Sequence, residues 1–446
     1  MKVHFLGIGG IGVSALAQYY LAKGHKVSGE DLSSSEITDF LQKLGIEIKI
    51  GKSTIEELQS INYKLPDLVI HTPAIKGNNL QLDFFKKAGV KCQTYPGALG
   101  ELTKNYTTIA VSGSHGKSTT TSMLALAMIK AGLDPTVIVG TKLKEFGNTN
   151  FCMGKSQYLV IEACEYDSSF LNYKPQTIAI TNIDKEHLDY FKTYANVKKA
   201  FKDFVMQLPR GGVLVANKDD KETDKISKSK FLISNQISIS KYSLKQKEAK
   251  KIKKILQVPG THNISNALAV LAIARSLKIE DKITYQALAE FHGTWRRFEE
   301  KAGTLLGFQI SNFKFQIISD YGHHPNEVKA TMQAVREKYK KQKIWLVFQP
   351  HQYQRTFYLQ KDFIKIFRNA KIDNIIITDI YDVAGRENAE IINKINSEKL
   401  VKKIGRKSVI YLPQQDCENY IKNNIKSSQV LLIMGAGDIY KLFDKF

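Results

Sequence analysis

The strongest chemical signal in the sequence is a glycine-rich loop that precedes a helical pattern. An apolar stretch, residues 107–112, runs into Gly113-Ser-His-Gly-Lys117-Ser118, and the helical pattern covers residues 117–131. Main-chain N–H groups of such a loop can surround a phosphate, a lysine can reach the β- and γ-oxygens, and a serine can ligate Mg²⁺. Val111 replaces the first glycine of the common pattern. The strand–loop–helix context still predicts ATP binding, by Gly113, Ser114, His115, Gly116, Lys117, Ser118 and Thr119.

Two further strand ends carry side chains that suit a metal ion beside this loop. Glu162 ends the apolar stretch 158–162, and His187 follows the apolar stretch 177–181. The carboxyl ends of parallel strands meet at one edge of a sheet. Mg²⁺ between phosphates usually takes only one or two carboxylates. We therefore expect Ser118, Glu162 and His187 to be the Mg²⁺ ligands.

A second glycine-rich loop lies at the N-terminus, between an apolar stretch (residues 3–6) and a helical pattern (residues 13–22). Gly7-Ile-Gly-Gly-Ile-Gly12 permits a tight turn and close approach of the backbone to a diphosphate. The following helix start favours an anion. Asp31 ends the next strand, where a ribose-binding acid belongs. The predicted site consists of Gly7, Gly9, Gly10, Gly12 and Asp31, and NAD, FAD or a UDP-sugar would each satisfy it.

These loops must be positioned by alternating strands and helices. Apolar stretches of strand length occur at 3–6, 26–29, 67–71 and 90–93, then at 107–112, 158–162, 177–181 and 213–216, and then at 315–319, 344–348, 374–378, 408–411 and 430–434. Helical patterns lie between many of them. This alternation predicts an α/β fold with largely parallel sheets.

The chain has 446 residues, which at roughly 150 residues per domain suggests three domains. Polar residues separate a helix from the next strand near 102–106, and a second break lies between 291 and 303. We therefore expect a Rossmann-like domain over 1–105, a phosphate-loop ATPase domain over 106–296, and a second Rossmann-like α/β domain over 297–446.

The net charge, the cysteine spacing and the length of the apolar runs indicate which binding partners and which cellular compartment suit this chain. The net charge is +22, and 56 of the 65 basic residues are lysine. Nucleic-acid readers depend on the bidentate geometry of arginine, so this surplus favours solvated surfaces and anionic small substrates over nucleic acid. The four cysteines form no C-x-x-C pair, which suggests a reducing compartment. No apolar run reaches the ~18 residues that cross a bilayer. We expect a cytoplasmic protein without membrane insertion.

Taken together, these blocks resemble the Mur ligase family, the ATP-dependent amide-forming enzymes of peptidoglycan precursor synthesis. The resemblance covers essentially the whole chain. It rests on the phosphate loop, on the stretches 162–170 and 181–189, on Pro259-Gly-Thr-His-Asn-Ile-Ser-Asn266, and on the blocks Asp320-Tyr-Gly-His-His-Pro325, Gln349-Pro-His-Gln-Tyr-Gln-Arg-Thr356 and Gly435-Ala-Gly-Asp438. It implies a UDP-sugar domain, a central ATPase and a C-terminal acceptor domain.

The resemblance also implies a reaction. ATP would phosphorylate the lactyl carboxylate of UDP-N-acetylmuramate, and the amine of L-alanine would then attack the acyl phosphate. His262, Asn263, Asn266, Arg297 and Asp320 would contact the nucleotide, and Tyr321 would bind substrate. Lys117 and Arg355 would act in catalysis, and the amine would lose its proton to a base, which leaves three candidates: His323, His324 and His351.

Three positions and one stretch depart from the pattern of the alanine-adding members. Gln352 stands where an arginine is usual, Ser319 where an aspartate is usual, and Trp295 where a small residue is usual. The stretch Glu162-Ala-Cys-Glu-Tyr-Asp167 is closer to the members that recycle an intact tripeptide. The main alternative is therefore ligation of UDP-N-acetylmuramate to a tripeptide. A nicotinamide-dependent dehydrogenase and a nucleic-acid-binding protein are weaker alternatives, because the second nucleotide loop argues against the former and no nucleic-acid module supports the latter.

Overall fold

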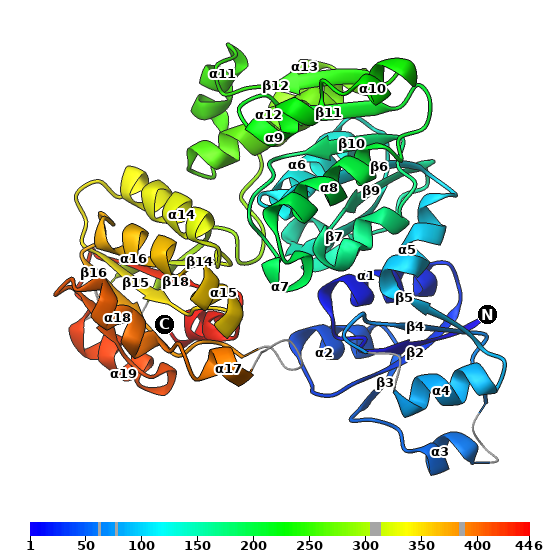
Figure 1. Cartoon of the computed structure of the whole chain (residues 1–446), viewed down its shortest axis with the longest axis horizontal. Coiled ribbons are helices and arrows are strands. Elements are labelled where there is room, and N and C mark those ends of the chain that lie inside the picture. The colour runs from blue at the N-terminus through cyan, green and yellow to red at the C-terminus, as the bar shows by residue number, and fades with distance from the viewer. Residues whose placement is uncertain (61–63, 76–78, 304–313, 383–388) are drawn as a thin grey trace. The chain divides into compact units, whose positions relative to one another are not determined.

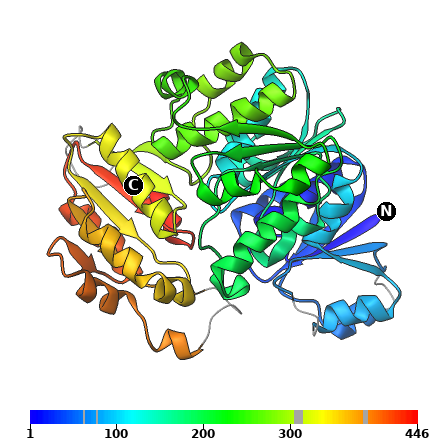
Figure 2. The ribbon, with the colours of Figure 1, turned by 45° about the horizontal axis from the view of Figure 1, so that its top comes forward.

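The computed structural model describes residues 1–60, 64–75, 79–303, 314–382 and 389–446. The described chain divides into two compact units. The first unit comprises Met1–Asp184, Ala195–Ala249 and Asn266–Leu288, and the second comprises Lys185–Tyr194, Lys250–Ser265 and Ala289–Phe446. Figures 1 and 2 show the described elements.

The N-terminal sheet of the first unit has five parallel strands in the order β3-β2-β1-β4-β5. Helices α1 and α2 lie on one side of this sheet, and α3 and α4 lie on the other (Figure 1). The elements are β1 (Lys2–Leu6), α1 (Ile11–Ala22), β2 (Lys26–Asp31), α2 (Glu36–Lys43), β3 (Glu47–Ile50), α3 (Ile55–Gln59), β4 (Leu68–His71), α4 (Leu80–Lys87), β5 (Lys91–Thr94) and α5 (Tyr95–Thr103).

The second sheet, also in the first unit, has the order β12-β11-β10-β6-β9-β7-β8, and only the β7–β8 pair is antiparallel among its described strands. Its elements are β6 (Thr107–Ser112), α6 (Lys117–Lys130), β7 (Thr136–Leu143), β8 (Thr149–Cys152), β9 (Tyr158–Glu162), β10 (Thr177–Ile180), α8 (Tyr194–Val205), β11 (Val213–Asn217), α9 (Lys221–Ile226), α10 (Lys230–Ser234) and β12 (Ser238–Tyr242). The chain continues with α11 (Glu248–Ile255), α12 (Thr261–Ser276) and α13 (Asp281–Ala289), of which the residues Lys250–Ser265 belong to the second unit. Short 3₁₀ helices cover Lys144–Phe146 and Tyr166–Asn172.

The second unit contains α7 (Leu188–Phe191) and a sheet in the order β13-β14-β18-β15-β16-β17, in which only β13 runs antiparallel to its described neighbour. Its further elements are β13 (Glu299–Gly303), β14 (Phe315–Asp320), α14 (Pro325–Lys338), β15 (Ile344–Phe348), α15 (Tyr353–Tyr358), α16 (Gln360–Arg368), β16 (Asn374–Ile377), α17 (Ala389–Ile392), α18 (Ser397–Ile404), β17 (Val409–Tyr411), α19 (Gln414–Asn424), β18 (Val430–Met434) and a 3₁₀ helix, Ile439–Lys445.

Helices cover both faces of this third sheet, as alternating side chains demonstrate. Ile318 belongs to a core with residues of α14, α16 and α18, whereas its neighbour Ile317 belongs to a separate core with residues of α19 and the last 3₁₀ helix. Successive side chains of a strand point to opposite faces. A parallel sheet buried on both faces is typical of α/β proteins.

The predicted α/β class with three largely parallel sheets is confirmed. The boundaries near residues 105 and 296 stay predictions. Side chains from the two N-terminal sheets meet inside one compact unit, since Gln18 on α1 donates to Asn150 Oδ1 over 2.9 Å and accepts from Thr149 Oγ1 over 2.6 Å. Among the described residues, no helix is sufficiently long and apolar to cross a membrane.

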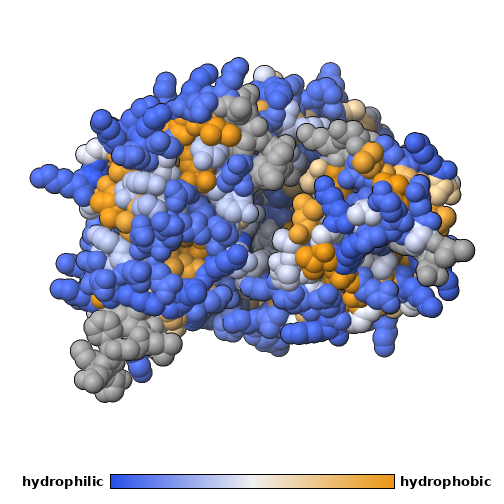
Figure 3. Space-filling view, turned by 90° about the horizontal axis from the view of Figure 1, so that it is seen from below, coloured by the Kyte–Doolittle hydropathy of each residue, from blue (hydrophilic) through white to orange (hydrophobic). Residues whose placement is uncertain are grey.

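The lysine surplus is largely on the surface. Helix α11 buries Ile252, whereas Lys250, Lys253 and Lys254 are exposed. Figure 3 shows hydrophilic residues over most of the face that it draws. This agrees with solvated faces as the main cause of the positive charge.

Candidate functional site

The predicted phosphate loop connects β6 to α6 in the first unit, and two of its glycines are required by geometry. Gly113 has φ +134° and Gly116 has φ +82°. A Cβ atom at Gly113 would lie 2.0 Å from Thr181 Oγ1, and one at Gly116 would lie 2.4 Å from Asn266 Oδ1. The tight loop therefore tolerates only glycine at these positions. It also brings Asn266 of α12 against the loop.

Residues after β10 hold the phosphate loop in place. Ser114 N–H donates to Asn182 O over 2.9 Å, and His115 N–H donates to Asn182 Oδ1 over 3.0 Å. The His115 ring lies 3.0 Å from Asp184 Oδ2, and Ser114 Oγ accepts from Asp184 N–H over 2.8 Å. These contacts use two of the loop amides that the sequence assigned to phosphate. The first turn of α6, with Ser118 and Thr119, offers the N–H groups that have no partner within the helix.

Lys117 begins α6 and is tied to a buried carboxylate. Its Nζ donates to Glu165 Oε2 and Oε1 over 2.9 and 3.2 Å, and to Gly113 O and Ser114 O over 2.6 and 3.1 Å. Glu165 is completely buried. Burial is the largest single influence and lowers the pKa of Lys117, but the charge and hydrogen bond of Glu165, together with the nearby Cys164 and Glu162, raise the pKa by more in total. The pKa is therefore raised and the ammonium stays charged.

The three predicted metal ligands are divided between the two units. In the first unit, the β6–β9 register pairs Glu162 with Val111, two residues before Gly113. Glu162 Oε2 accepts from Gly140 N–H over 2.8 Å, and Ser118 lies in the first turn of α6. His187, in the second unit, precedes α7 with φ +55°. The predicted set of three thus stays a prediction.

The N-terminal glycine loop is closed by Asp31. Its Oδ2 accepts from Gly9 N–H over 2.8 Å. Gly7 N–H donates to Glu30 O over 2.8 Å, and Gly10 is the residue before α1. A Cβ atom at Gly12 would lie 2.7 Å from the Tyr95 ring. The structure thus brings the predicted glycines and Asp31 together, with one Asp31 oxygen already bonded to the loop.

In the second unit, the third sheet brings the predicted acceptor residues to one edge, because they follow the parallel strands β14, β15 and β16. The His351 ring stacks on Tyr381, with centroids 5.5 Å apart and planes at 8°, and it lies 5.8 Å from the His323 ring. Arg355 Nη1 lies 3.0 Å from His351 Nδ1. Arg355 Nη2 lies 3.3 Å from Glu186 Oε2.

Glu186 is the buried anion of this group. Burial raises the pKa of Glu186. Arg355, and after it His324, His187 and His323, lower this pKa by more in total, so it lies well below its ordinary value. A small cavity beside it is lined by His187, Gln352 and Arg355, among others. A guanidinium and imidazoles around one carboxylate suit the binding of a carboxylate-bearing substrate.

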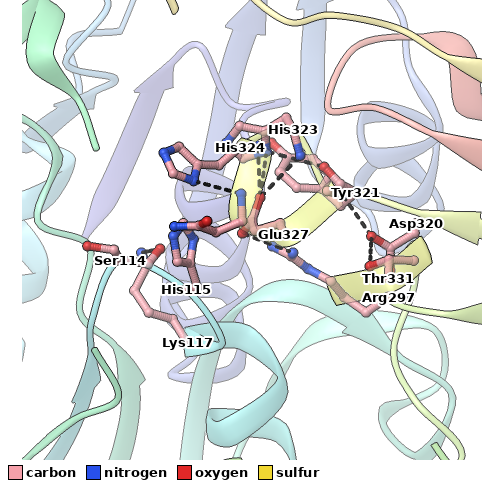
Figure 4. Close-up of polar contacts among 12 residues, drawn as sticks. Ser114, His115, Lys117, Arg297, Asp320, Tyr321, His323, His324, Glu327 and Thr331 are labelled. Atoms are coloured by element: carbon pink, nitrogen blue, oxygen red, sulfur yellow. Dashed lines mark hydrogen bonds and ion pairs between the residues drawn. The ribbon is translucent and has the colours of Figure 1, made fainter. Parts of the chain in front are cut away.

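Glu327, on α14, organises the two adjacent histidines. Its Oε2 accepts from His323 N–H and His324 N–H over 3.1 and 3.3 Å, and its Oε1 lies 3.8 Å from Arg297 Nη1 (Figure 4). Burial is the largest influence on His323 and lowers its pKa to about 4. His323 is therefore neutral near pH 7, the form that accepts a proton.

Asp320 and Tyr321 connect this group to the segment before β13. Asp320 Oδ2 accepts from Phe298 N–H over 3.0 Å, and its Oδ1 accepts from Gly322 N–H over 2.9 Å. Asp320 Oδ1 also accepts from Thr331 Oγ1 over 3.2 Å (Figure 4). The Tyr321 ring lies 4.8 Å from the guanidinium carbon of Arg297. Three donors occupy a carboxylate that offers about four lone-pair sites.

His262 and Asn263 occupy the first turn of α12, one turn before Asn266. Asn263 Nδ2 donates to Pro259 O over 2.7 Å. A Cβ atom at Gly260 would lie 2.5 Å from His262 Cε1. The helix start is thus held by local contacts, and its predicted nucleotide contacts stay a prediction.

The structure gives two of the unusual residues a local role. Trp295 lies 5.4 Å from the guanidinium carbon of Arg296, which also lies 4.8 Å from Tyr321 and 4.3 Å from Tyr440. Arg296 Nη2 donates to Gly435 O and Gly437 O. Gln352 is buried with φ +71°, and its N–H donates to Tyr381 O over 2.9 Å. Ser319 is buried on β14, and nothing in the structure explains why it replaces an aspartate.

Four acidic partners were missed by the sequence analysis: Asp184, Glu165, Glu186 and Glu327. Each lies on a loop or in a helical turn, so no periodic pattern identifies it. The only available signal was their position within three residues of a predicted site residue or block.

Comparison with known families covers most of the chain. Residues 2–107 match the Mur ligase family, catalytic domain; residues 111–274 match the Mur ligase middle domain; and residues 308–437 match the Mur ligase, glutamate ligase domain. Two curated relatives, both called UDP-N-acetylmuramate–L-alanine ligase, come from Acetivibrio thermocellus (39% identity, 100% of this chain and 95% of the relative) and Alkaliphilus metalliredigens (40%, 98% and 95%).

Solved structures give the same grouping. The UDP-N-acetylmuramate–alanine ligase of Thermotoga maritima has a TM-score of 0.78 at 27% identity and covers 100% of this chain and 98% of its own. A murein peptide ligase of Psychrobacter arcticus has a TM-score of 0.71 at 22% identity, with the same coverage. The second similarity is one of fold alone.

Proposed function

The chain belongs to the Mur ligase family, and we propose that it joins UDP-N-acetylmuramate to L-alanine with ATP as the energy source. The observation that carries this proposal is the full-length identity of 36–40% to relatives named for that reaction. The phosphate loop with its charged Lys117 suits the use of ATP. The enzyme is thus an ATP-dependent carboxylate–amine ligase of peptidoglycan precursor synthesis.

The reaction needs ATP because a carboxylate does not react directly with an amine. Transfer of the γ-phosphoryl group to the lactyl carboxylate of UDP-N-acetylmuramate forms an acyl phosphate and ADP. The amine of L-alanine attacks the acyl carbon, the C–O bond to phosphate breaks, and a proton leaves the nitrogen. Phosphoryl transfer depends mainly on positioning and charge neutralisation. Lys117 and the N–H groups at the start of α6 would serve that step.

A magnesium ion fits the residues beside this loop. The Ser118 hydroxyl and the Glu162 carboxylate supply oxygen donors, which Mg²⁺ prefers. Only Oε2 of Glu162 receives a described N–H bond, from Gly140, so Oε1 is suited to a cation. His187 completes the proposed set. Bound there, Mg²⁺ would neutralise phosphate charge.

The remaining contacts of ATP are assigned by the resemblance. Gly113–Thr119 would surround the phosphates, and His262, Asn263 and Asn266 would contact the nucleotide from α12. Arg297 and Asp320 would contact it from the second unit. Because three donors already bind Asp320, at most one further lone-pair site is left for a ribose hydroxyl.

The third sheet would supply the acceptor site. Arg355 would bind a substrate carboxylate, and Tyr321 would bind the muramoyl or acceptor group. His323, His324 and His351 are the candidates for the base that removes the amine proton. The lowered pKa of His323 keeps it neutral and able to accept that proton at neutral pH.

The N-terminal loop would bind the diphosphate of UDP-N-acetylmuramate through Gly7, Gly9, Gly10 and Gly12. Asp31 would act mainly by holding Gly9, with its other oxygen available to the ribose. Because the reaction uses ATP and a UDP-sugar, we place the enzyme in the cytoplasm.

The test is a coupled assay of phosphate release by the purified chain. L-alanine should stimulate release only when ATP, Mg²⁺ and UDP-N-acetylmuramate are all present. The tripeptide L-Ala-γ-D-Glu-diaminopimelate should not replace it. Stimulation by the tripeptide alone would establish the recycling reaction instead.

A further inference from the structure

The N-terminal sheet carries a polar groove on the face opposite α1. His4 and Leu6 alternate with Val3 and Phe5, so the two pairs point to opposite faces. Leu6 packs with Leu58 and Phe85 of α3 and α4, and the His4 ring lies 5.9 Å from Phe85. The face that includes His4 is therefore the face of α3 and α4.

On the same face of the sheet, next to α3 and α4, lie polar side chains of β1, β2 and β3. In register, Ser28 of β2 pairs with His4 of β1 and with Glu47 of β3, and Lys26 pairs with Lys2. These residues line a groove of about 850 Å³, together with Glu30, Lys49, Ser53, Lys64 and others. Its volume lies within the range of small-molecule sites, ~300–1,000 Å³.

The floor of the groove is a buried hydrogen-bonding cluster. His4 is 7% exposed, and its Nδ1 lies 2.9 Å from Ser28 Oγ. Glu30 accepts from Ser53 N–H over 3.0 Å and from Gln81 Nε2 over 2.8 Å, and the Ser53 hydroxyl also contacts it. The charge of Glu30 is thus well satisfied by donors from the protein.

One polar atom of this cluster has no hydrogen bond. His4 Nε2 is buried without a hydrogen-bond partner, and its nearest acid oxygen, Glu30 Oε1, lies 3.8 Å away. Burial lowers the pKa of His4 more than Glu30 raises it, so the ring is neutral. A buried nitrogen without a hydrogen bond destabilises the folded chain. A hydroxyl group of a ligand in the groove would remove this destabilisation.

The amino end of the strands adds positive charge. Lys2 and Lys26 are direct neighbours on β1 and β2, both are exposed, and Lys64 lines the same end of the groove. Like charges placed opposite each other on adjacent strands repel. A phosphate between them would relieve this repulsion. His4 and Ser28 lie two residues farther along, which is about 7 Å at ~3.3 Å per residue.

We propose that this groove binds a sugar phosphate, with its phosphate at Lys2, Lys26 and Lys64 and its hydroxyl groups at His4 and Ser28. The spacing of about 7 Å matches the length of a hexose phosphate. The site is separate from the glycine loop, which lies at the opposite, carboxyl end of these strands. The inference does not depend on the proposed ligase activity.

The test is a binding experiment on the full chain with saturating ADP and UDP-N-acetylmuramate, which occupy the nucleotide sites. Glucose 6-phosphate, inorganic phosphate and glucose are titrated separately, by calorimetry and by histidine imidazole NMR. The His4 signal is identified among the ten histidines by the His4→Gln variant. We expect glucose 6-phosphate to shift this signal and to bind at least tenfold more tightly than phosphate or glucose.

Variants distinguish binding in the groove from non-specific attraction of the phosphate to the positive charge of the protein. Lys26→Gln should weaken binding at least tenfold, whereas Lys43→Gln on α2, with the same loss of charge, should not. If His4→Gln fails to fold, Ser28→Ala tests the predicted hydroxyl contacts at the floor of the groove. It should weaken the binding of glucose 6-phosphate more than the binding of inorganic phosphate. No shift of the His4 signal, equal affinity for phosphate and glucose 6-phosphate, or equal effects of Lys26→Gln and Lys43→Gln would each overturn the proposal.

Discussion

Lys117 has two roles that can be separated by mutation. Its ammonium binds Glu165 over 2.9 and 3.2 Å, and the Glu165 side chain is completely buried. In Lys117→Ala, this buried carboxylate loses the cation. Removing one partner of a buried ion pair costs about 3–5 kcal/mol. We therefore expect Lys117→Ala to lower the stability of the first unit as well as to slow ligation strongly.

The double variant Lys117→Ala/Glu165→Gln also removes the negative charge of residue 165. It should recover about half or more of the lost stability, so the two substitutions should be non-additive by about 2 kcal/mol or more. Activity should not recover, because the phosphate loop still lacks its ammonium. We expect kcat to stay about 10²–10³-fold below wild type in both variants, the usual effect of removing one electrostatic group.

Hydrogen exchange of the segment 107–130 measures local stability around the loop, and phosphate release measures activity. Lys104→Ala is the matched control, since Lys104 forms an exposed pair with Glu101 in the same unit and should cost under about 1 kcal/mol. If Lys117→Ala were as stable as Lys104→Ala, the ion-pair reasoning would be wrong. Near-normal ligation by Lys117→Ala would refute the phosphate-loop assignment.

Three further predictions concern the second unit. Arg296→Met should cost about 1–3 kcal/mol because it leaves two buried carbonyl groups without their donor; urea unfolding followed by tryptophan fluorescence measures this, and an unchanged midpoint would contradict it. Glu186→Gln should raise the KM for L-alanine more than the KM for ATP, because Arg355 loses its anionic partner; equal effects on both values would count against the acceptor role. The pKa of His323 is about 4, below the ~6.5 of a histidine in the unfolded chain. As the pH falls below ~6.5, the unfolded chain therefore takes up this proton while the folded chain does not, and the free energy of unfolding decreases until pH ~4. Thermal melts at several pH values should show that the melting temperature of His323→Gln falls less steeply with decreasing pH than that of the wild type. Identical pH profiles of the two proteins would exclude a contribution of His323.

Much of the fold follows from local patterns. The predicted stretches 107–112, 158–162, 344–348 and 430–434 are strands with the same bounds in the structure. Long apolar runs bounded by polar turns identify strands that are buried on both faces. The short β3 and the antiparallel β8 were not predicted, because they lie at sheet edges and their sequences are mostly polar or mixed.

The site was predictable where chemistry imposes a residue type at a fixed spacing. Gly113, Gly116 and Lys117 are in this class, since the loop geometry admits only glycine at two positions. Glu165 and Glu186 are not, because each acts through a partner far away in the sequence. The role of Trp295 was not predictable either, because the guanidinium of Arg296 lies against both Trp295 and the distant residue Tyr440.

The most direct test of the central claim follows the oxygen atoms of the reaction. UDP-N-acetylmuramate is labelled with heavy oxygen in its lactyl carboxylate and incubated with the enzyme, ATP, Mg²⁺ and L-alanine. An acyl phosphate intermediate predicts one labelled oxygen in the released phosphate and one in the new amide. Unlabelled phosphate, or labelled phosphate without an L-alanine amide, would contradict the account.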